Sequence, residues 1–280
     1  MTKNAAMELI SSRSNKAIKY LKSLGLARNR QKERRFLIEG VRIVEEAMGV
    51  PGCLKKLIAT PTGVAGDRAQ ALITTAGERG IEVIWVADRV MDYISETKTN
   101  QGIMALVTPV EFALDDLEKG QIPMIAVAHL LQDPGNLGTM MRVAEAAGIG
   151  GVVITPGTVD FYNPKALRAT MGSIFRLPTV RTESLQSFVG RFREKGYQVA
   201  AALVSGKTRY FEMDYLKPTV VLFGQEGAGL PSDAYRLTDT QLSIPMATMM
   251  DSLNVASAAS VIMYEAVRQK LAGGGELVRR

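Results

Sequence analysis

The 280-residue sequence is 46% hydrophobic and 22% charged, enough apolar material for one large core or two moderate ones, and we expect two domains. Its single cysteine, Cys53, and single histidine, His129, exclude a disulfide framework and a zinc site built from Cys and His clusters, and they argue against Ser-His-Asp or Cys-His catalysis. No apolar run approaches the roughly 18 residues of a membrane helix. Residues 1–30 also lack a signal-peptide core, so the sequence predicts a cytoplasmic protein with no membrane and no metal partner.

The net charge of +6 is concentrated at the start of the chain. Residues 1–35 hold ten basic and two acidic side chains, a net +8, so the remainder carries −2. This concentration favours a polyanionic partner, although a solvated basic helix face is the simpler interpretation. The candidate phosphate contacts are Arg28, Arg30, Arg34 and Arg35.

The first part of the chain alternates between helical and strand patterns. Ala17, Ile18, Leu21 and Leu24 recur at helical spacing between basic residues, which predicts one amphipathic basic helix from Ser14 to about Arg30. Further strands and helices alternate after it, which indicates a small α/β domain over residues 1–108, followed by a polar linker over 109–122. The expected strands are 36–39, 54–60, 81–87 and 102–107, and the expected helices are 41–48, 66–78 and 88–94.

A second alternating series follows over residues 123–272, and a Gly-rich tail over 273–280 is expected to be flexible. Its strands are nearly continuous apolar runs, which suit a parallel sheet covered on both faces. The expected strands are 124–131, 152–155, 197–204, 219–224 and 241–245, and the expected helices are 136–147, 163–171, 184–195 and 254–271.

Three segments of this second series share one form: an apolar strand ends, a turn follows, and small or polar residues come next. In open α/β sheets, ligands bind at such carboxyl ends of strands. In the first segment, Asp133-Pro134-Gly135 predicts a turn, Asn136 is well placed as a helix cap, and Arg142 falls in the second helical turn. A cap and a surface ion-pair partner remain sufficient explanations of Asn136 and Arg142.

The second segment places Glu226 among Gly224, Gly227 and Gly229. It lacks the spacing of a dinucleotide fingerprint, and a lone acid in a glycine loop is often only a turn-stabilising carboxylate. In the third segment, Ser252 and Asn254 can cap the last helix. The small residues of 256–260 permit a close helix approach, for which tight internal packing is the simpler explanation.

Two features are expected to carry no chemistry. SGKT (205–208) resembles the end of a phosphate loop, but the residues before it form a strand and leave no room for a glycine-rich cradle. His129 is expected to be a packed strand residue rather than a base.

The three segments together resemble the signature motifs of the SpoU branch of the SPOUT methyltransferases, in the family's order. NLGTMMR (136–142) resembles the first motif, FGQEGAGL (223–230) the second and IPMATMMDSLNVASAAS (244–260) the third. Parts of residues 12–110 (SRSNKAIKYLKSL, RRFLIEGVRIVEEA and ISETKTNQGIMALV) resemble the small RNA-binding domain that precedes the catalytic domain in many members.

This resemblance implies an S-adenosylmethionine-dependent RNA methyltransferase that acts on a ribose 2′-hydroxyl. It implies a small N-terminal α/β RNA-binding domain, a C-terminal α/β SPOUT domain with a trefoil knot, and a homodimer whose active site is completed across the interface. Backbone groups of Gly224, Ile244 and Leu253 would hold the cofactor.

The resemblance also implies the catalytic set Asn136, Arg142, Glu226, Ser252 and Asn254. Arg142 would activate the 2′-hydroxyl, either as the base or by electrostatic anchoring of a phosphate and the developing alkoxide, because a guanidinium rarely gives up its proton. Asn136 and Glu226 would orient Arg142 or the ribose. Ser252 and Asn254 would fix the loop and the substrate.

The folded N-terminal domain favours 23S ribosomal RNA as the substrate. A tRNA 2′-O-methyltransferase and a catalytically silent RNA-binding protein are the alternatives, and the same attraction of basic residues to a polyanion serves all three.

Overall fold

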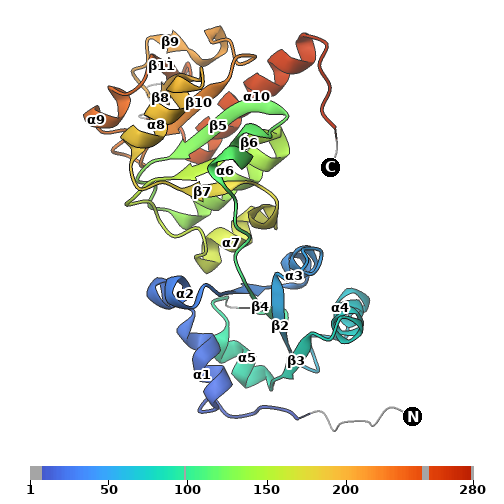
Figure 1. Ribbon diagram of the computed structural model, residues 1–280. Helices are drawn as coiled ribbons and strands as arrows, with labels where there is room; N and C mark the ends of the chain where they lie inside the picture. The colour runs from blue at the N-terminus through green and yellow to red at the C-terminus, as the bar shows by residue number, and fades with distance from the viewer. Residues whose placement is uncertain (1–7, 98, 248–251, 279–280) are drawn as a thin grey trace. The chain divides into compact units, whose positions relative to one another are not determined.

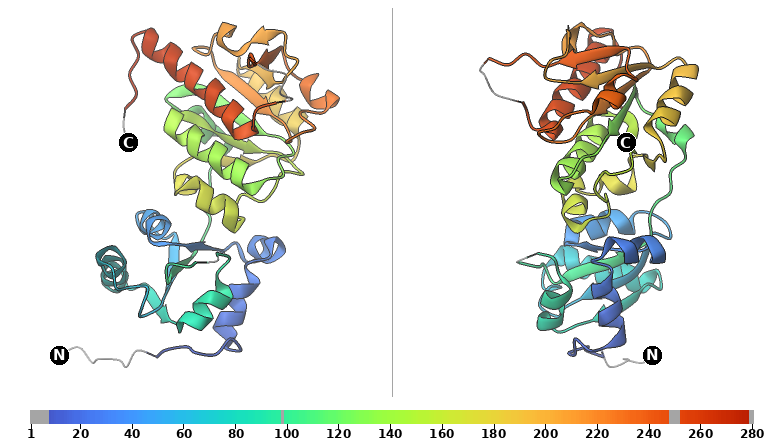
Figure 2. Two further views of the ribbon diagram at one scale, coloured as in Figure 1. Left: turned by 180° about the vertical axis from the view of Figure 1, so that it is seen from behind. Right: turned by 90° about the vertical axis from the view of Figure 1, so that its left-hand side faces the viewer.

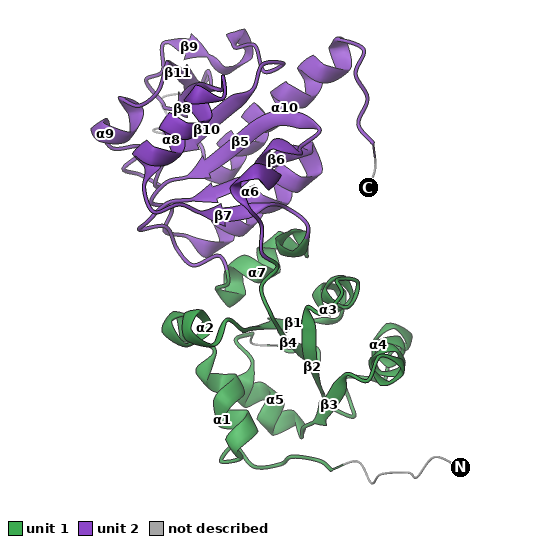
Figure 3. Ribbon diagram, in the orientation of Figure 1, with its two compact units in different colours: residues 1–110, 162–175 green, residues 111–161, 176–280 purple. Residues whose placement is uncertain are grey.

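The computed structural model describes residues 8–97, 99–247 and 252–278. It divides into two compact units, the first formed by residues 1–110 and 162–175 and the second by residues 111–161 and 176–280 (Figure 3). The first unit thus recruits a segment from the second half of the chain. Lys3, residues 248–251 of the third motif and the two last arginines lie outside the described residues.

The first unit is built on a four-stranded mixed sheet in the order β1-β4-β2-β3. Helices cover both faces: α1 and α5 pack on one side, and α3 and α4 on the other (Figure 1). The strands are β1 (Phe36–Glu39), β2 (Leu54–Ala59), β3 (Glu82–Trp85) and β4 (Ile103–Val107). The helices are α1 (Lys16–Ser23), α2 (Ala27–Glu33), α3 (Val41–Met48), α4 (Asp67–Glu78), α5 (Asp88–Ile94) and α7 (Pro164–Thr170), with a 3₁₀ turn η2 (Ser173–Phe175).

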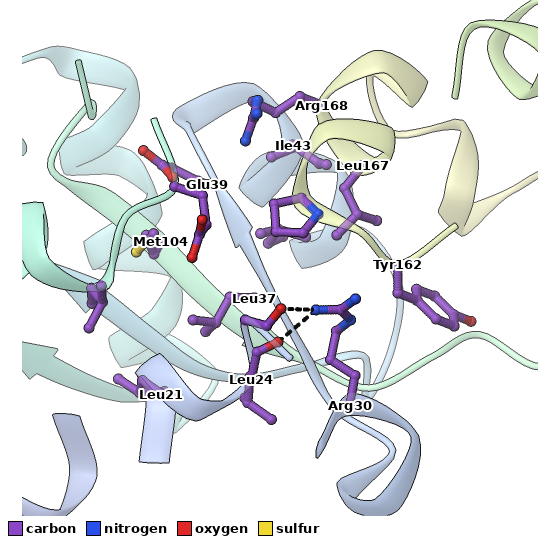
Figure 4. A pocket seen from close by; sticks show the side chains of 15 residues that line it. Leu21, Leu24, Arg30, Leu37, Glu39, Ile43, Met104, Tyr162, Leu167 and Arg168 are labelled. Atoms are coloured by element: carbon purple, nitrogen blue, oxygen red, sulfur yellow. Dashed lines mark hydrogen bonds between the residues drawn. The ribbon is translucent and has the colours of Figure 1, made fainter. Parts of the chain in front are cut away.

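The predicted single basic helix is wrong, because the chain breaks between α1 and α2. Ile18, Leu21 and Leu24 are buried in the core against α5 and the sheet, as their spacing predicted. Arg30 is only 5% exposed, and its Nη1 donates to the carbonyl oxygens of Leu24 at 2.9 Å and Gly25 at 2.8 Å (Figure 4). These bonds satisfy the carbonyls freed by the helix break, which a straight helix would have used internally.

The second unit is built on a seven-stranded, entirely parallel sheet in the order β7-β6-β5-β10-β8-β11-β9. Helices α6 and α10 cover one face, and α8 covers the other (Figure 2). The strands are β5 (Ile122–Ala128), β6 (Ile149–Ile154), β7 (Thr179–Arg181), β8 (Gln198–Ala202), β9 (Thr208–Arg209), β10 (Thr219–Phe223) and β11 (Thr240–Ser243). The helices are α6 (Pro134–Ala147), α8 (Leu185–Glu194), α9 (Ser232–Tyr235) and α10 (Val255–Ala272), with 3₁₀ turns η1 (Leu114–Glu118) and η3 (Tyr210–Glu212).

The parallel sheet confirms the predicted fold class for the second unit, and the apolar runs behave as expected. Every residue of β6 and β10 is buried, because helices cover both faces of the sheet.

The predicted linker and tail have defined contacts. Leu117 of η1 is buried beside Ile125 and Val153, so the predicted linker contributes to the core of the second unit. In the tail, Val278 exchanges two hydrogen bonds with Gln121, at 2.7 and 2.8 Å.

Candidate active site

The three candidate segments meet at the carboxyl edge of the parallel sheet. From β5 the chain crosses to β6 on one side, whereas β10 pairs with β5 on the other, so the strand order reverses between β5 and β10. Open α/β sheets bind ligands at such a reversal. The loops that follow β5 and β10 therefore flank the expected binding position.

The first turn of α6 leaves Asn136 free to interact with other loops. The helix begins at Pro134, and the carboxylate of Asp133 caps it by accepting from the Asn136 backbone N–H at 2.9 Å. The prediction that Asn136 is the cap is therefore wrong, and Arg142 lies in the third helical turn rather than the second. Asp133 could have been recognised as the cap, because proline prefers the first helical position and the cap is then the residue before Pro134.

The Asn136 side chain joins all three segments. Its Nδ2 donates to Oε1 of Glu226 at 2.9 Å, and its Oδ1 accepts from Nδ2 of Asn254 at 2.9 Å. Asn254 also caps α10, because its Oδ1 accepts from the backbone N–H groups of Ala256 at 2.9 Å and Ser257 at 3.3 Å. Both the cap expected of Asn254 and the grouping with Asn136 and Glu226 are present. We call Asn136, Glu226 and Asn254 the amide–carboxylate network.

Glu226 is held from two directions. Its second oxygen, Oε2, accepts from the backbone N–H of Gln132 at 3.2 Å, so protein donors occupy both carboxylate oxygens. The glycine loop around it is closed by a reciprocal backbone pair between Gln225 and Gly229, at 3.0 and 2.8 Å. This carboxylate does more than stabilise its own turn, because it fixes the loop after β5.

The loop needs glycine at position 224. A Cβ at buried Gly224 would lie 2.5 Å from both the carbonyl carbon and the oxygen of Gly229, which are backbone atoms that cannot move independently. Gly229 itself has a φ of +70°, in the region that favours glycine.

Arg142 and Ser252 remain apart from the amide–carboxylate network. Both are exposed, and within the described residues neither side chain forms a hydrogen bond or an ion pair. Arg142 is thus free to contact a ligand, and the surface ion pair considered for it does not form with any described residue.

The three predicted cofactor residues lie at strand and helix ends. Gly224 follows β10, Ile244 follows β11, and Leu253 precedes the Asn254 cap of α10. Across residues 8–97, 99–247 and 252–278, no hydrogen bond joins the backbones of these three residues to another residue. Gly224 is buried, and a buried backbone group without a partner is rare. Such groups are suited to bind a ligand.

The four candidate RNA-binding arginines fall into two classes. Arg28 and Arg34 are exposed and Arg35 is half-buried, so these three can reach a phosphate. Arg30 instead serves the helix break, and its assignment as a phosphate contact is wrong because its guanidinium is committed to backbone carbonyls inside the unit.

A cation–aromatic cluster in the first unit was missed. The guanidinium of Arg13 lies 5.2 Å, and the ammonium of Lys22 5.5 Å, from the ring centroid of Tyr93. Only the basic side of this cluster was visible in the sequence, because Tyr93 comes from α5, far along the chain.

The two features expected to carry no chemistry, His129 and SGKT, have these surroundings. His129 Nδ1 lies 2.9 Å from the Thr155 hydroxyl, and burial lowers the pKa of His129, which fits a packed neutral ring. In SGKT, Thr208 begins the short strand β9, and only the three-residue 3₁₀ turn η3 follows, so the loop and α-helix N-terminus of a phosphate-binding loop are not formed by these residues.

A cavity of about 30 Å³ lies in the first unit, lined by Glu39, Arg30 and Arg168 among others (Figure 4). It has room for one or two water molecules, too little for a nucleotide. Nη1 of Arg168, one of the lining residues, is buried and has no partner among the described residues, and a water could satisfy it.

Every helix in the described part of the chain is too short or too polar to span a membrane. No group of three or more His, Cys, Asp or Glu side chains in the same part could hold a metal ion.

Comparisons with known proteins cover nearly the whole chain. Residues 123–264 match the SpoU rRNA Methylase family, and residues 15–105 match the MRM3-like substrate binding domain. The chain is 34% identical over 258 residues, 92% of its length and 98% of the relative's, to the 23S rRNA (guanosine(2553)-2′-O)-methyltransferase RlmP of Bacillus subtilis. It is 32% identical over 277 residues, 96% of its length and 94% of the relative's, to the 23S rRNA (uridine(2479)-2′-O)-methyltransferase of Streptomyces viridochromogenes.

A solved structure matches over a similar share of the chain. The SpoU methyltransferase AviRb from Streptomyces viridochromogenes, in complex with the cofactor AdoMet, superimposes with a TM-score of 0.82 at 30% identity and covers 94% of this chain and 100% of its own.

Proposed function

The chain belongs to the SpoU rRNA methylase family, and from this we propose that it transfers a methyl group from S-adenosylmethionine to a ribose 2′-hydroxyl of 23S ribosomal RNA. The observation that carries the proposal is the amide–carboxylate network, which draws one side chain from each of the three motifs to one edge of the sheet.

The cofactor would be held by Gly224, Ile244 and Leu253, whose backbone groups have no partner among the described residues. Bound there, S-adenosylmethionine supplies an electrophilic methyl group on a sulfonium. Methyl transfer would break the S–CH₃ bond, with its electron pair going to sulfur, and form the O–CH₃ bond, while the hydroxyl would release its proton to water. The protein must align the hydroxyl with the S–CH₃ bond and stabilise the charge that develops on oxygen.

We assign Arg142 to the developing alkoxide or to the neighbouring phosphate. Its side chain is exposed and bonds no described residue, and a guanidinium is a permanent cation with several donors. Asn136 and Glu226 bond each other, so their proposed role is to hold the loops in place. Asn254 fixes the start of α10, and Ser252, exposed next to it, is assigned to the substrate.

The function is tested by incubating the protein with radiolabelled S-adenosylmethionine and unmodified rRNA or tRNA, then mapping the label. The proposal expects label on a ribose of 23S rRNA. Label on tRNA alone would make the chain a tRNA 2′-O-methyltransferase, and cofactor binding without transfer to any RNA would make it a silent RNA-binding protein. The trefoil knot stays a prediction.

The second unit should bind S-adenosylmethionine without RNA, with calorimetry showing saturable binding at one site per chain. Gly224→Ala should abolish this binding, because its Cβ would lie 2.5 Å from the Gly229 backbone and force the loop apart. Gly190→Ala is the matched control, since nothing lies within 4 Å of a Cβ there. Unchanged affinity in Gly224→Ala would remove Gly224 from the cofactor site.

We propose a homodimer that forms through the outward face of α10. The small residues of 256–260 do not offer this face, because Ala256 and Ala259 are already buried inside the protomer, where α10 packs on α6. The outward stripe carries Tyr264 and Leu271, seven residues apart and each 50% exposed, which would be covered in such a dimer.

Light scattering at micromolar concentration should therefore report twice the 30.4 kDa of the chain. Tyr264→Lys should shift the protein toward monomer, because it places a charge in the apolar stripe, whereas Phe211→Lys, an exposed aromatic outside α10, should not. An active monomer of the unchanged chain would contradict the dimer.

A further inference from the structure

The side chain of Gln132 joins two loops beside the amide–carboxylate network. Its Nε2 donates to the carbonyl oxygens of Leu130 and Gly157, both at 2.8 Å, while its backbone N–H donates to Oε2 of Glu226 at 3.2 Å. Gln132 is thus bonded to its own loop after β5, to the loop after β6 through Gly157, and to the loop after β10 through Glu226. No role for this residue follows from the three motifs.

The loop that Gln132 holds has an unfavourable backbone conformation. Leu130 has a φ of +60°, in the left-handed region that a leucine rarely adopts. Gly157 has a φ of +82°, and a Cβ there would lie 2.5 Å from Cδ2 of Leu130, so the two loops are in close contact. Such a conformation persists only when surrounding bonds fix it, and the two bonds from Nε2 connect to these two residues.

We propose that Gln132 is a positioning residue for methyl transfer, an inference that rests on the proposed function. Its side-chain amide holds the loop after β5 so that its backbone N–H meets Glu226. Glu226 in turn fixes Asn136 through the 2.9 Å bond from Nδ2. Gln132 touches no reacting atom and acts through Glu226, on the geometry of the helix that carries Arg142.

The test is Gln132→Met, which keeps the length of the side chain and removes both Nε2 donors. We expect kcat to fall about 10- to 100-fold, the scale of a small misplacement of reacting groups, with the KM for S-adenosylmethionine nearly unchanged. Gln186→Met, at an exposed glutamine on α8, is the matched control and should keep full activity. A kcat equal to that of the unchanged chain would overturn the proposal.

A double-mutant cycle with Glu226→Gln separates positioning from independent effects. If Gln132 acts through Glu226, the two losses in kcat should not multiply, because the second change removes an interaction already lost. Losses that multiply would show that the residues act separately and would overturn the proposed route.

Hydrogen exchange distinguishes failure of this inference from failure of the proposed function. Gln132→Met should speed hydrogen exchange of the backbone amide at position 132, because the loop no longer holds this N–H against Glu226. This measurement does not depend on methyl transfer. Unchanged exchange would overturn the positioning role even in an active enzyme. An unchanged chain that methylates no RNA would overturn the function alone.

Discussion

Arg142→Ala should reduce methyl transfer about 10²–10³-fold, the usual loss when one donor to a developing oxyanion is removed. The expected mechanism is local, because the side chain is exposed and bonds no described residue, so its removal breaks no internal contact. Cofactor affinity, measured by calorimetry, should stay nearly unchanged, since the proposed cofactor contacts are backbone groups of other loops.

Two further variants sharpen this prediction. Arg142→Lys keeps the positive charge but loses the planar set of donors, so partial recovery would favour electrostatic anchoring over a role as the base. Arg191→Ala, at an exposed arginine on α8 whose ion pair with Asp115 spans 2.9 Å, should retain full activity. Equal loss of cofactor binding in Arg142→Ala would make Arg142 structural.

The second large effect is expected from the basic residues of the first unit. Replacing Arg28, Arg34 and Arg35 together with Gln should weaken RNA binding strongly at low salt and flatten its salt dependence. Each neutralised phosphate contributes roughly 0.7–0.9 to the slope of log affinity against log salt, so losing three contacts should lower that slope by about 2 to 3. The measurement is the dissociation constant for rRNA between 50 and 200 mM salt, a range over which phosphate contacts change affinity greatly.

This variant leaves Arg30 unchanged for a structural reason. Removing the guanidinium would leave the buried carbonyl of Leu24 and the part-buried carbonyl of Gly25 without this donor. An unsatisfied buried group costs about 1–3 kcal/mol, so the variant would confuse RNA binding with stability. Charge substitution is also preferable to deleting residues 1–110, because the rest of that unit would lose its packing: α7 packs on β1, and the ring of Tyr162 stacks on Phe36 at 4.4 Å.

A matched control replaces three exposed arginines of the second unit, Arg176, Arg191 and Arg193, with Gln. Their ion pairs are at the surface and contribute little to stability. If the control weakens RNA binding as much as the test variant, net charge rather than the α2 region determines affinity. An unchanged slope in the test variant would mean that the basic segment is a solvated face.

Local sequence patterns determined most of the elements. The helices 41–48 and 88–94 and the strand 36–39 are confirmed to the residue, because 3.6- and 2-residue periodicities reflect which face a side chain buries. The missed β7, β9 and α9 have only three, two and four residues. Segments that short contain about one repeat of the relevant period, which is too little for a pattern to show.

Tertiary structure decided the end of the first helix and the cap of α6. The apolar spacing continued past Ser23, and only the burial of Arg30 against the carbonyls of Leu24 and Gly25 reveals the break. Asp133 and Asn136 are both good caps, and local preference did not separate them. Asn136 bonds Glu226 instead, which is possible only because β5 and β10 are neighbours in the sheet.

The sequence by itself determined an α/β protein with a parallel sheet, the family and the residue types of its motifs, because these follow from local periodicity and motif spacing. Only the tertiary structure decided which motif residues meet. Asn136 bonds Glu226 across 90 positions of sequence and Asn254 across 118, while Arg142 and Ser252 bond neither. The physical reason is that strand order sets these distances, and strand order depends on the packing of the whole sheet rather than on any local stretch of chain.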